Sequence, residues 1–224
     1  MKIKKIVAIG PESTGKSTLC AQLAEHYNSL WVPEYAREYL EKNGTQYSYD
    51  DLLTIAKGQI ELEEGISDQQ SVISNQQPAI SDQQLAISQK NSATNIQRLP
   101  LSSPPSGAGG LLFIDTDMYV MKVWCEFVFN KCHNQILNQI ATRHYDAYLL
   151  CDVDLPWIKD KLREYPDIKM REKLYHFYKD MMIHQCAPWC IISGDKKERV
   201  NKAISFIEKS VIPNKFSSKQ DNNL

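Results

Sequence analysis

Residues 10–18 form a glycine-rich segment, GPESTGKST, that matches the phosphate-binding pattern GxxxxGK[ST]. Glycines in this pattern let the backbone turn, so that several N–H groups converge on an anion. Lys16 would place a cation between the β- and γ-phosphates, and the Ser17 hydroxyl could bind Mg²⁺. The segment therefore predicts a site for ATP and Mg²⁺. The residues expected to contact the nucleotide are Gly10, Glu12, Ser13, Thr14, Gly15, Lys16, Ser17 and Thr18.

Acidic residues that could complete such a site follow the apolar run LLFI. Asp115 ends this run, which is where an acid next to the metal is expected at the carboxyl end of a strand. Ser17 and Asp115 are thus the predicted metal ligands, although Asp115 could instead cap a helix. Asp117 is a candidate for binding the phosphate acceptor, and it too could simply cap the helix that begins near Met118.

A further carboxylate, Glu34, lies in the segment VPEYAREY after a short apolar run. A carboxylate there would face the acceptor side of a kinase cleft and could orient or deprotonate a hydroxyl. Arg37 lies three residues later, and the alternative is a surface ion pair between the two. The sequence leaves open whether Glu34, Asp115 or Asp117 accepts the proton.

Residues 160–171 are rich in charge and are expected to form a lid over the triphosphate. Asp160, Arg163 and Arg171 are the candidate lid residues, because basic side chains there would stabilise the transferring phosphoryl group. A solvated charged helix is an equally good interpretation. Residues 193–195 follow the last predicted strand and are a weaker candidate for contact with the adenine base.

Apolar runs alternate with helical patterns along the chain and would position these residues. The alternation predicts an α/β protein with a P-loop NTPase fold, a five-stranded parallel sheet flanked by helices. A strand before the glycine-rich segment and a helix after it argue against a glycine turn without nucleotide. The predicted strands span residues 3–9, 30–32, 111–115, 147–151 and 189–192, and the predicted helices span residues 18–27, 33–40, 50–62, 119–129, 134–143, 156–185 and 196–207.

A low-complexity insertion interrupts this pattern. From Ile66 the chain repeats every seven residues (ISDQQSV, ISNQQPA, ISDQQLA, ISQKNSA) and continues into a Pro/Gly/Ser-rich segment. A coiled coil is the alternative to disorder, but one apolar column and Pro78 disfavour it. The expected organisation is a single kinase domain over residues 1–64 and 110–210, a disordered insertion over 65–109 and a flexible tail over 211–224.

The composition limits the possible partners. The 224 residues carry a net charge of −1, so no basic excess predicts binding to nucleic acid or an anionic membrane. No apolar stretch reaches the roughly 20 residues of a membrane span, and the six cysteines form no CxxC pair. A cytoplasmic protein with a small-molecule, nucleoside-like substrate is expected, while the oligomeric state is not indicated.

Four blocks in order, GPESTGKSTL, VPEYAREYL, FIDTD and LLCDVDLPWIKDKLRE, resemble the ribosylnicotinamide kinase domain of NadR-type proteins. This resemblance covers the chain except the insertion and tail. It implies an ATP-dependent kinase that converts nicotinamide riboside to nicotinamide mononucleotide in NAD salvage. It further implies catalytic roles for Lys16, Glu34, Asp115 and Arg163, an acceptor site with Glu34, Tyr35, Arg37, Asp117 and Trp124, and a lid block with Asp160 and Arg163; Trp31 and Tyr39 are further aromatics near these blocks.

The chain departs from the bifunctional members of this family. Their adenylyltransferase domain precedes the kinase, whereas here the glycine-rich segment begins at residue 10, so the chain is not expected to make NAD itself. Two other functions stay open. One is a kinase for another nucleoside or a vitamin alcohol, because fold does not fix substrate. The other is a nucleotide-dependent regulatory ATPase that acts through a partner.

Overall fold

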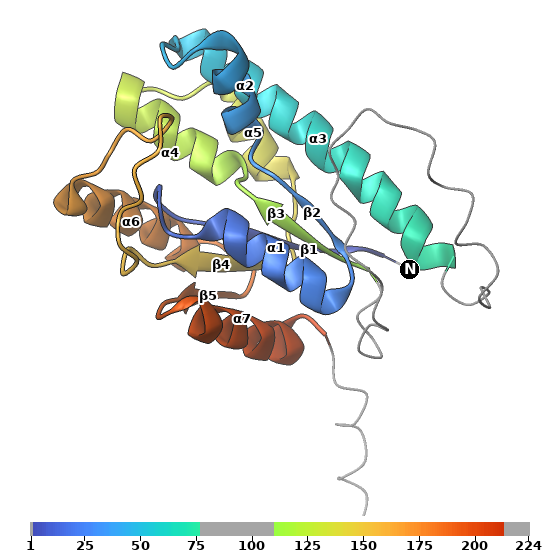
Figure 1. The fold of residues 1–224 in the computed structure, drawn as a ribbon. Helices are drawn as coiled ribbons and strands as arrows, with labels where there is room; N and C mark the ends of the chain where they lie inside the picture. The colour runs from blue at the N-terminus through green and yellow to red at the C-terminus, as the bar shows by residue number, and fades with distance from the viewer. Residues whose placement is uncertain (1, 77–109, 213–224) are drawn as a thin grey trace, which may run out of the picture.

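The computed structural model describes residues 2–76 and 110–212, which form a parallel sheet with helices on both faces (Figure 1). The strand order is β2-β3-β1-β4-β5, and every pairing is parallel. The predicted α/β P-loop NTPase fold with five parallel strands is therefore confirmed. The strands are β1 (Lys4–Ile9), β2 (Leu30–Val32), β3 (Leu111–Asp115), β4 (Ala147–Cys151) and β5 (Trp189–Ile192).

Helices cover both faces of the sheet because the three central strands are buried almost throughout. One face packs against α1 and α7, and the other packs against α3, α4 and α6. The helices are α1 (Lys16–Tyr27), α2 (Tyr35–Asn43), α3 (Tyr49–Gln76), α4 (Met118–Phe129), α5 (Asn134–Thr142), α6 (Ile168–Ile183) and α7 (Lys196–Ser210).

The strand register brings the chemistry-bearing segments to one edge of the sheet. β1 lies between β3 and β4, and Ala8 pairs with Asp115 on one side and with Leu149 on the other. The glycine-rich loop that follows β1, the acid at the end of β3 and the residues after β4 therefore emerge together. This is the carboxyl edge, where open parallel sheets bind ligands.

A third apolar cluster lies between α2, α3, α4 and α5, and it fixes the segment that carries Glu34. Gly58 of α3 faces the ring of Tyr35, and a β-carbon at Gly58 would come within 2.1 Å of that ring. Gln59 accepts a hydrogen bond from the backbone N–H of Tyr35 at 2.7 Å and donates to the carbonyl of Pro33 at 3.2 Å. α3 thus holds both ends of the turn around Glu34.

The predicted start of the insertion at residue 65 is wrong, because α3 continues to Gln76. Ile66 of the first repeat is buried against the sheet. Gln70 accepts a hydrogen bond from the backbone N–H of Leu30 at 2.8 Å, at the amino end of β2. The first repeat therefore belongs to the folded domain, while the rest of the predicted insertion, residues 77–109, lies outside the described residues.

Two other expected boundaries also change. Residues 156–167 are irregular and α6 begins at Ile168, because Pro166 and the capping Asp167 precede it. Helix α7 extends to Ser210, and the predicted tail beyond residue 212 lies outside the described residues. Within the described residues, no helix combines the length and the apolar character needed to cross a membrane.

Candidate active site

The glycine-rich loop depends on two glycines. Gly10 has a φ of 138°, and a β-carbon there would lie 2.7 Å from the carbonyl oxygen of Cys151. Gly15 has a φ of 78° and forms the left-handed N-cap of α1. Thr14 stabilises the turn by donating its hydroxyl to the carbonyl of Pro11 at 2.8 Å. The loop thus places the amino end of α1 toward the space above β1, a geometry suited to phosphate.

Lys16 lies at the start of α1 with its ammonium folded over the same loop. Its Nζ donates to the carbonyl oxygens of Gly10 at 3.0 Å and Pro11 at 3.1 Å. Both acceptors are neutral, so the positive charge is available to an anion in the loop. The ammonium group predicted to bind the β- and γ-phosphates therefore lies against the glycine-rich loop.

Ser17 contacts the acid at the end of β3. Its hydroxyl donates to Oδ2 of Asp115, while the Thr116 hydroxyl lies 3.5 Å from both Asp115 Oδ1 and Glu34 Oε1. The structure therefore brings the three residues predicted from separate segments, Ser17, Asp115 and Glu34, into one cluster at the carboxyl edge. Thr116, which links them, was not predicted from the sequence.

The cluster has the donor chemistry of a magnesium site. Burial raises the pKa of the Asp115 carboxyl above its usual range, Lys16 opposes this effect and Glu34 adds to it. A divalent cation would supply the missing positive charge. Mg²⁺ prefers hard oxygen ligands and keeps waters or phosphate oxygens in most positions, so Ser17 and Asp115 suffice as protein donors. The residues present thus fit the metal.

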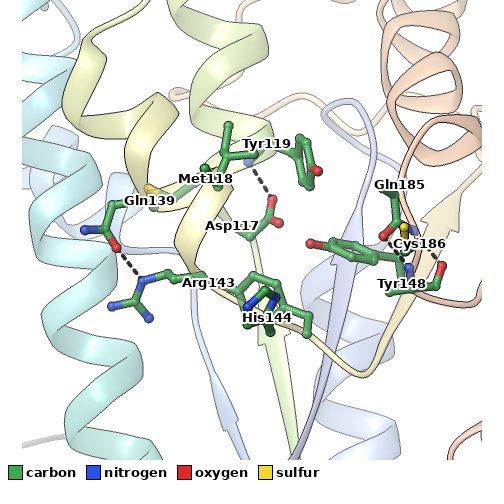
Figure 2. Close-up of a pocket in the computed structure, with 13 residues that line it drawn as sticks. Asp117, Met118, Tyr119, Gln139, Arg143, His144, Tyr148, Gln185 and Cys186 are labelled. Atoms are coloured by element: carbon green, nitrogen blue, oxygen red, sulfur yellow. Dashed lines mark hydrogen bonds between the residues drawn. The ribbon is translucent and has the colours of Figure 1, made fainter.

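Asp117, predicted to bind the phosphate acceptor, is buried at the amino end of α4 (Figure 2). It caps α4, and Oδ1 accepts from the backbone N–H groups of Tyr119 and Val120. Burial raises the pKa of Asp117 to about 7, against the lowering effect of these two N–H groups. The capping alternative considered from the sequence is present, and the acceptor role stays a prediction.

Arg37 bonds the lid segment and not Glu34. Its guanidinium donates to Asp160 at 2.9 Å, with Glu41 at 3.9 Å as a second acidic neighbour. Asp160 also accepts from the backbone N–H of Leu162, and this bond and Arg37 hold its pKa below the usual range. The acceptor block and the lid block, 123 residues apart in sequence, are therefore joined by one ion pair.

The predicted lid arginines contact the glycine-rich loop directly. Arg163 donates to the Ser13 hydroxyl at 3.3 Å, and Arg171 donates to the Ser13 carbonyl at 3.3 Å. Both guanidinium groups lie over the Trp157 ring, at 5.9 and 5.6 Å from its centre. Two cations are thus held beside the loop, close to where a triphosphate would carry its charge.

Glu12 ties the backbone of the lid to the loop. Its Oε2 accepts from the N–H groups of Glu164 at 3.0 Å and Tyr165 at 3.1 Å. Burial raises the pKa of Glu12, and these two hydrogen bonds oppose the shift. The Glu12 side chain thus positions residues 164–165, and its contact with nucleotide stays a prediction.

Arg199 of α7 contacts the glycine-rich loop and was not predicted as a site residue from the sequence. Its side chain is 4% exposed. It donates to the carbonyls of Thr14 at 2.9 Å, Asp152 at 3.1 Å and Gly194 at 2.9 Å, and it pairs with Asp154. One guanidinium thus connects the phosphate loop, the end of β4 and the turn after β5.

The turn after β5 contains Gly194 and Asp195, and both residues make hydrogen bonds that stabilise the fold. Asp195 caps α7 in a reciprocal capping box with Glu198. Gly194 has a φ of 102° and donates its backbone N–H to Asp154 at 2.5 Å. No contact among the described residues tests the weaker prediction that this turn holds adenine.

Aromatic residues predicted near the acceptor line the wall formed by α2, α3 and α4. Trp124 donates its indole N–H to the Tyr47 hydroxyl at 2.7 Å and packs edge-on against that ring. Tyr35 and Tyr39 lie with ring centres 6.5 Å apart, and Tyr39 donates to Asp51 at 2.5 Å. Trp31, by contrast, packs on the opposite face of the sheet with α1 and α7.

The loop, the acid at the neighbouring strand end and the lid arginines define a P-loop nucleotide-binding protein. The sequence profile described as "AAA domain" matches residues 5–199. This match covers most of the chain, so the protein belongs to the AAA domain family of P-loop proteins.

Curated relatives match at low identity. The chain is 22% identical over 167 residues to "Trifunctional NAD biosynthesis/regulator protein NadR" of Salmonella typhimurium, covering 72% of this chain and 31% of that protein. The NadR of Escherichia coli K12 is 22% identical over 184 residues, covering 80% and 36%. The chain therefore spans about a third of the length of these relatives. The resemblance to NadR-type proteins is confirmed at this level.

Solved structures share the fold. A NadR protein in complex with NR has a TM-score of 0.59 at 20% identity, covering 93% of this chain and 49% of that one. Another NadR structure contains NAD and AMP-PNP, with a TM-score of 0.57 at 18% identity and the same coverage. Thymidylate kinase from Ehrlichia chaffeensis has a TM-score of 0.58 at 13% identity, covering 92% and 100%. The fold is thus that of the P-loop kinases.

Proposed function

We propose that this chain is an ATP-dependent kinase that phosphorylates nicotinamide riboside to nicotinamide mononucleotide. The observation that carries the proposal is the cluster in which Ser17 and Asp115 lie together with Glu34 across Thr116. In this cluster the predicted metal ligands, Ser17 and Asp115, lie near the Glu34 carboxylate, which could orient an acceptor hydroxyl. A phosphotransferase needs such a carboxylate, whereas a regulatory ATPase without an acceptor does not. The NadR relatives and the NR-containing NadR structure support the choice of acceptor.

The phosphoryl transfer would use groups already gathered at the sheet edge. Bound at Ser17 and Asp115, Mg²⁺ would neutralise charge on the β- and γ-phosphates. Lys16 would stabilise the same oxygens, and Arg163 and Arg171 would stabilise the transferring group from the lid side. The bond from phosphorus to the β–γ bridging oxygen breaks as the bond to the ribose 5′-oxygen forms, and ADP leaves.

Glu34 is the best candidate to orient the acceptor hydroxyl and receive its proton. Asp115 is engaged by Ser17, and Asp117 is 1% exposed and caps α4. Glu34 accepts a single long contact from Thr116 in the described structure, so it retains capacity to accept from a substrate. Arg37 and Asp160 would close the acceptor side against the lid.

The test is a substrate panel with purified protein. Incubation with Mg-ATP and each of several nucleosides, deoxynucleoside monophosphates and vitamin alcohols is followed by mass spectrometry of the product and by ADP release. We expect nicotinamide mononucleotide from nicotinamide riboside, with the rate lowered by about 10²-fold or more in Lys16→Ala. Lys57→Ala, an exposed change on α3, is the matched control.

Other outcomes separate the alternatives. Turnover of a different acceptor, lost in Lys16→Ala, would keep the kinase and refute nicotinamide riboside as its substrate. ADP release without any phosphorylated acceptor would refute the kinase and favour a regulatory ATPase.

A further inference from the structure

Tyr47 lies where the aromatic wall formed by α2, α3 and α4 meets the lid. It belongs to residues 44–48, the connection between α2 and α3, and packs edge-on against Trp124 and Phe129 of α4, with ring centres 5.0 and 6.3 Å away. Its hydroxyl accepts from the Trp124 indole N–H at 2.7 Å and donates to Oε2 of Glu164 in the lid at 2.9 Å. One side chain thus bonds both to a residue predicted to contact the acceptor and to a lid residue 117 positions away in the sequence.

The chemistry of the three groups fixes the direction of these hydrogen bonds. An indole N–H can only donate, and an ionised carboxylate can only accept. The Tyr47 hydroxyl does both, so the chain of hydrogen bonds runs from Trp124 through Tyr47 to Glu164. Burial raises the pKa of the Tyr47 hydroxyl, which therefore keeps the proton that it donates. Hydrogen bonds in such a chain polarise one another, so the loss of either bond weakens the other.

Residues 164 and 165 of the lid contact the aromatic wall and the glycine-rich loop at the same time. Their backbone N–H groups donate to Glu12 of the loop at 3.0 and 3.1 Å. On the other side, Glu164 accepts from Tyr47, and the Tyr165 ring packs edge-on against Phe127 of α4 with ring centres 5.2 Å apart. Figure 1 shows this segment, between β4 and α6, beside α4. A change in the loop that moves residues 164–165 would therefore also alter the contacts of the wall.

We propose that Tyr47 is a positioning residue that couples the aromatic wall to the lid, so that nucleotide at the loop and acceptor at the wall bind more tightly together than apart. The inference rests on the proposed function only in that an acceptor occupies the wall. An acceptor packed against Trp124 would fix the indole, and the bonds through Tyr47 and Glu164 would then hold the lid backbone at Glu12. Coupling between two sites is reciprocal, so nucleotide at the loop would fix the wall to the same extent.

The first measurement needs nucleotide alone. The four tryptophans are labelled with ¹⁵N at the indole, and the Trp124 signal is assigned with Trp124→Phe. Saturating Mg-AMP-PNP should shift the Trp124 N–H signal in the unaltered chain, and this shift should be lost in Tyr47→Phe. Tyr49→Phe is the matched control, because it removes a neighbouring phenol hydroxyl that has no hydrogen bond among the described residues, and it should leave the shift unchanged.

Variants of Glu164 test the same path from the lid side, at an exposed position where the fold should tolerate the change. Glu164→Ala leaves the bond between Tyr47 and Trp124 in place, yet the shift caused by nucleotide should be lost. Glu164→Gln keeps a carbonyl that can accept from Tyr47 and should retain the shift. A merely structural role for Tyr47 would not separate these two lid variants.

The second measurement adds the acceptor. Calorimetry gives the Kd of Mg-AMP-PNP with and without saturating nicotinamide riboside, or with whichever acceptor the substrate panel identifies. We expect the acceptor to tighten nucleotide binding by about fivefold or more in the unaltered chain and by less than about twofold in Tyr47→Phe.

The inference is overturned if nucleotide does not shift the Trp124 signal, if the shift is the same in Tyr47→Phe and Tyr49→Phe, or if the acceptor tightens nucleotide binding equally with and without the Tyr47 hydroxyl. Failure to find any acceptor would refute the proposed kinase alone, because the response of Trp124 to nucleotide would still decide the coupling.

Discussion

Thr116 adopts a φ of 79°, a backbone conformation that is rare for a β-branched residue. It lies directly between Asp115 and Asp117, and its hydroxyl faces both Asp115 and Glu34. Backbone strain of this kind costs about 1–3 kcal/mol and persists where the surroundings hold it, most often at functional sites. The two acids at the end of β3 point to different places, Asp115 to Ser17 and Asp117 to the amino end of α4.

Glu34→Gln tests the acceptor role at the level of one residue. The amide keeps the size of the side chain but is a poor proton acceptor, so we expect kcat to fall by about 10²-fold or more while KM for ATP changes little. Steady-state kinetics with the acceptor varied at saturating Mg-ATP provides the measurement.

Glu38→Gln on the exposed face of the same helix is the control, and it should leave kcat unchanged. A Glu34→Gln enzyme with normal kcat would show that positioning by other groups suffices and would remove Glu34 from the proposed mechanism.

Several site residues could be predicted from the sequence because their roles follow from local pattern. Lys16 and Ser17 are fixed by the glycine-rich spacing, and Asp115 by its place at a strand end. Arg199 could not be predicted, since its four partners are at least 5 residues away and up to 185 residues away. A helical arginine gives no local signal of such contacts.

At the scale of the elements, hydrogen bonds couple the lid to the glycine-rich loop in both directions. A side chain of the loop bonds the lid backbone, and a side chain of α6 bonds the loop backbone. Glu12 of the loop holds two N–H groups of the lid, and Arg171 of α6 holds the carbonyls of Ser13 and Leu155. Nucleotide that alters the loop would therefore also alter residues 155–165. The lid segment was expected to be part of a helix over residues 156–185, but Pro156, Pro166 and these tertiary contacts hold residues 156–167 in an irregular conformation.

Glu12→Ala should release this segment. Losing two hydrogen bonds of about 1 kcal/mol each raises the local opening of the lid, so trypsin should cut after Lys159, Lys161 or Arg163 about fivefold or more faster. Timed digestion and mass spectrometry would locate the cut. Glu12→Gln keeps a carbonyl acceptor and should be cut at an intermediate rate; equal rates for all three proteins would contradict the coupling.

Arg199→Met should destabilise the junction of α7, β4 and the loop. The change leaves Asp154 without its ionic partner and several carbonyls without a donor, and we expect unfolding to become easier by about 2–4 kcal/mol. Urea denaturation measures the difference. Lys197→Met, exposed on the same helix, should change stability by less than about 0.5 kcal/mol, and an equal effect of both would argue against this role of Arg199.

At the scale of the whole molecule, the candidate active site lies at the carboxyl edge of the sheet, whereas the end of α3 and Gly110 lie near the amino edge (Figure 1). α3 has 28 residues, about 42 Å of helix, and runs from the cluster around Leu52 to the amino end of β2. The chain re-enters at Gly110, whose carbonyl accepts from the N–H of Lys4 at 2.6 Å, at the amino end of β1. The five strands were predictable from their apolar runs, whereas this geometry was not, because helical spacing does not tell where α3 ends when its repeat is mostly polar.

Replacing residues 77–109 by a short Gly/Ser linker should therefore leave phosphotransfer within about twofold of the full chain. Closure entropy changes little with the length of a connection, and both attachment points lie at the amino ends of strands, away from the glycine-rich loop. Kinetic comparison of the two proteins with the same acceptor is the measurement. A second deletion that begins at Gly65 serves as the contrast, since it removes Ile66 and Gln70 from the core and should lower stability. Loss of turnover in the first deletion would show that the insertion contributes to the cleft.

The position of these attachment points also affects how freely the number of repeats can change during evolution. Tandem units of seven residues are prone to gain or lose copies when DNA is replicated, and most positions in a folded enzyme would not tolerate a change in length. Here units added or lost after the first repeat would change the length of the chain between Gln76 and Gly110, and the contacts that flank this stretch are at the amino ends of β2 and β1. Selection acting on catalysis would then leave the number of repeats unconstrained. We therefore expect closely related sequences to differ in repeat number, while the distance in sequence from β1 to Lys16 and from β3 to Asp117 stays constant.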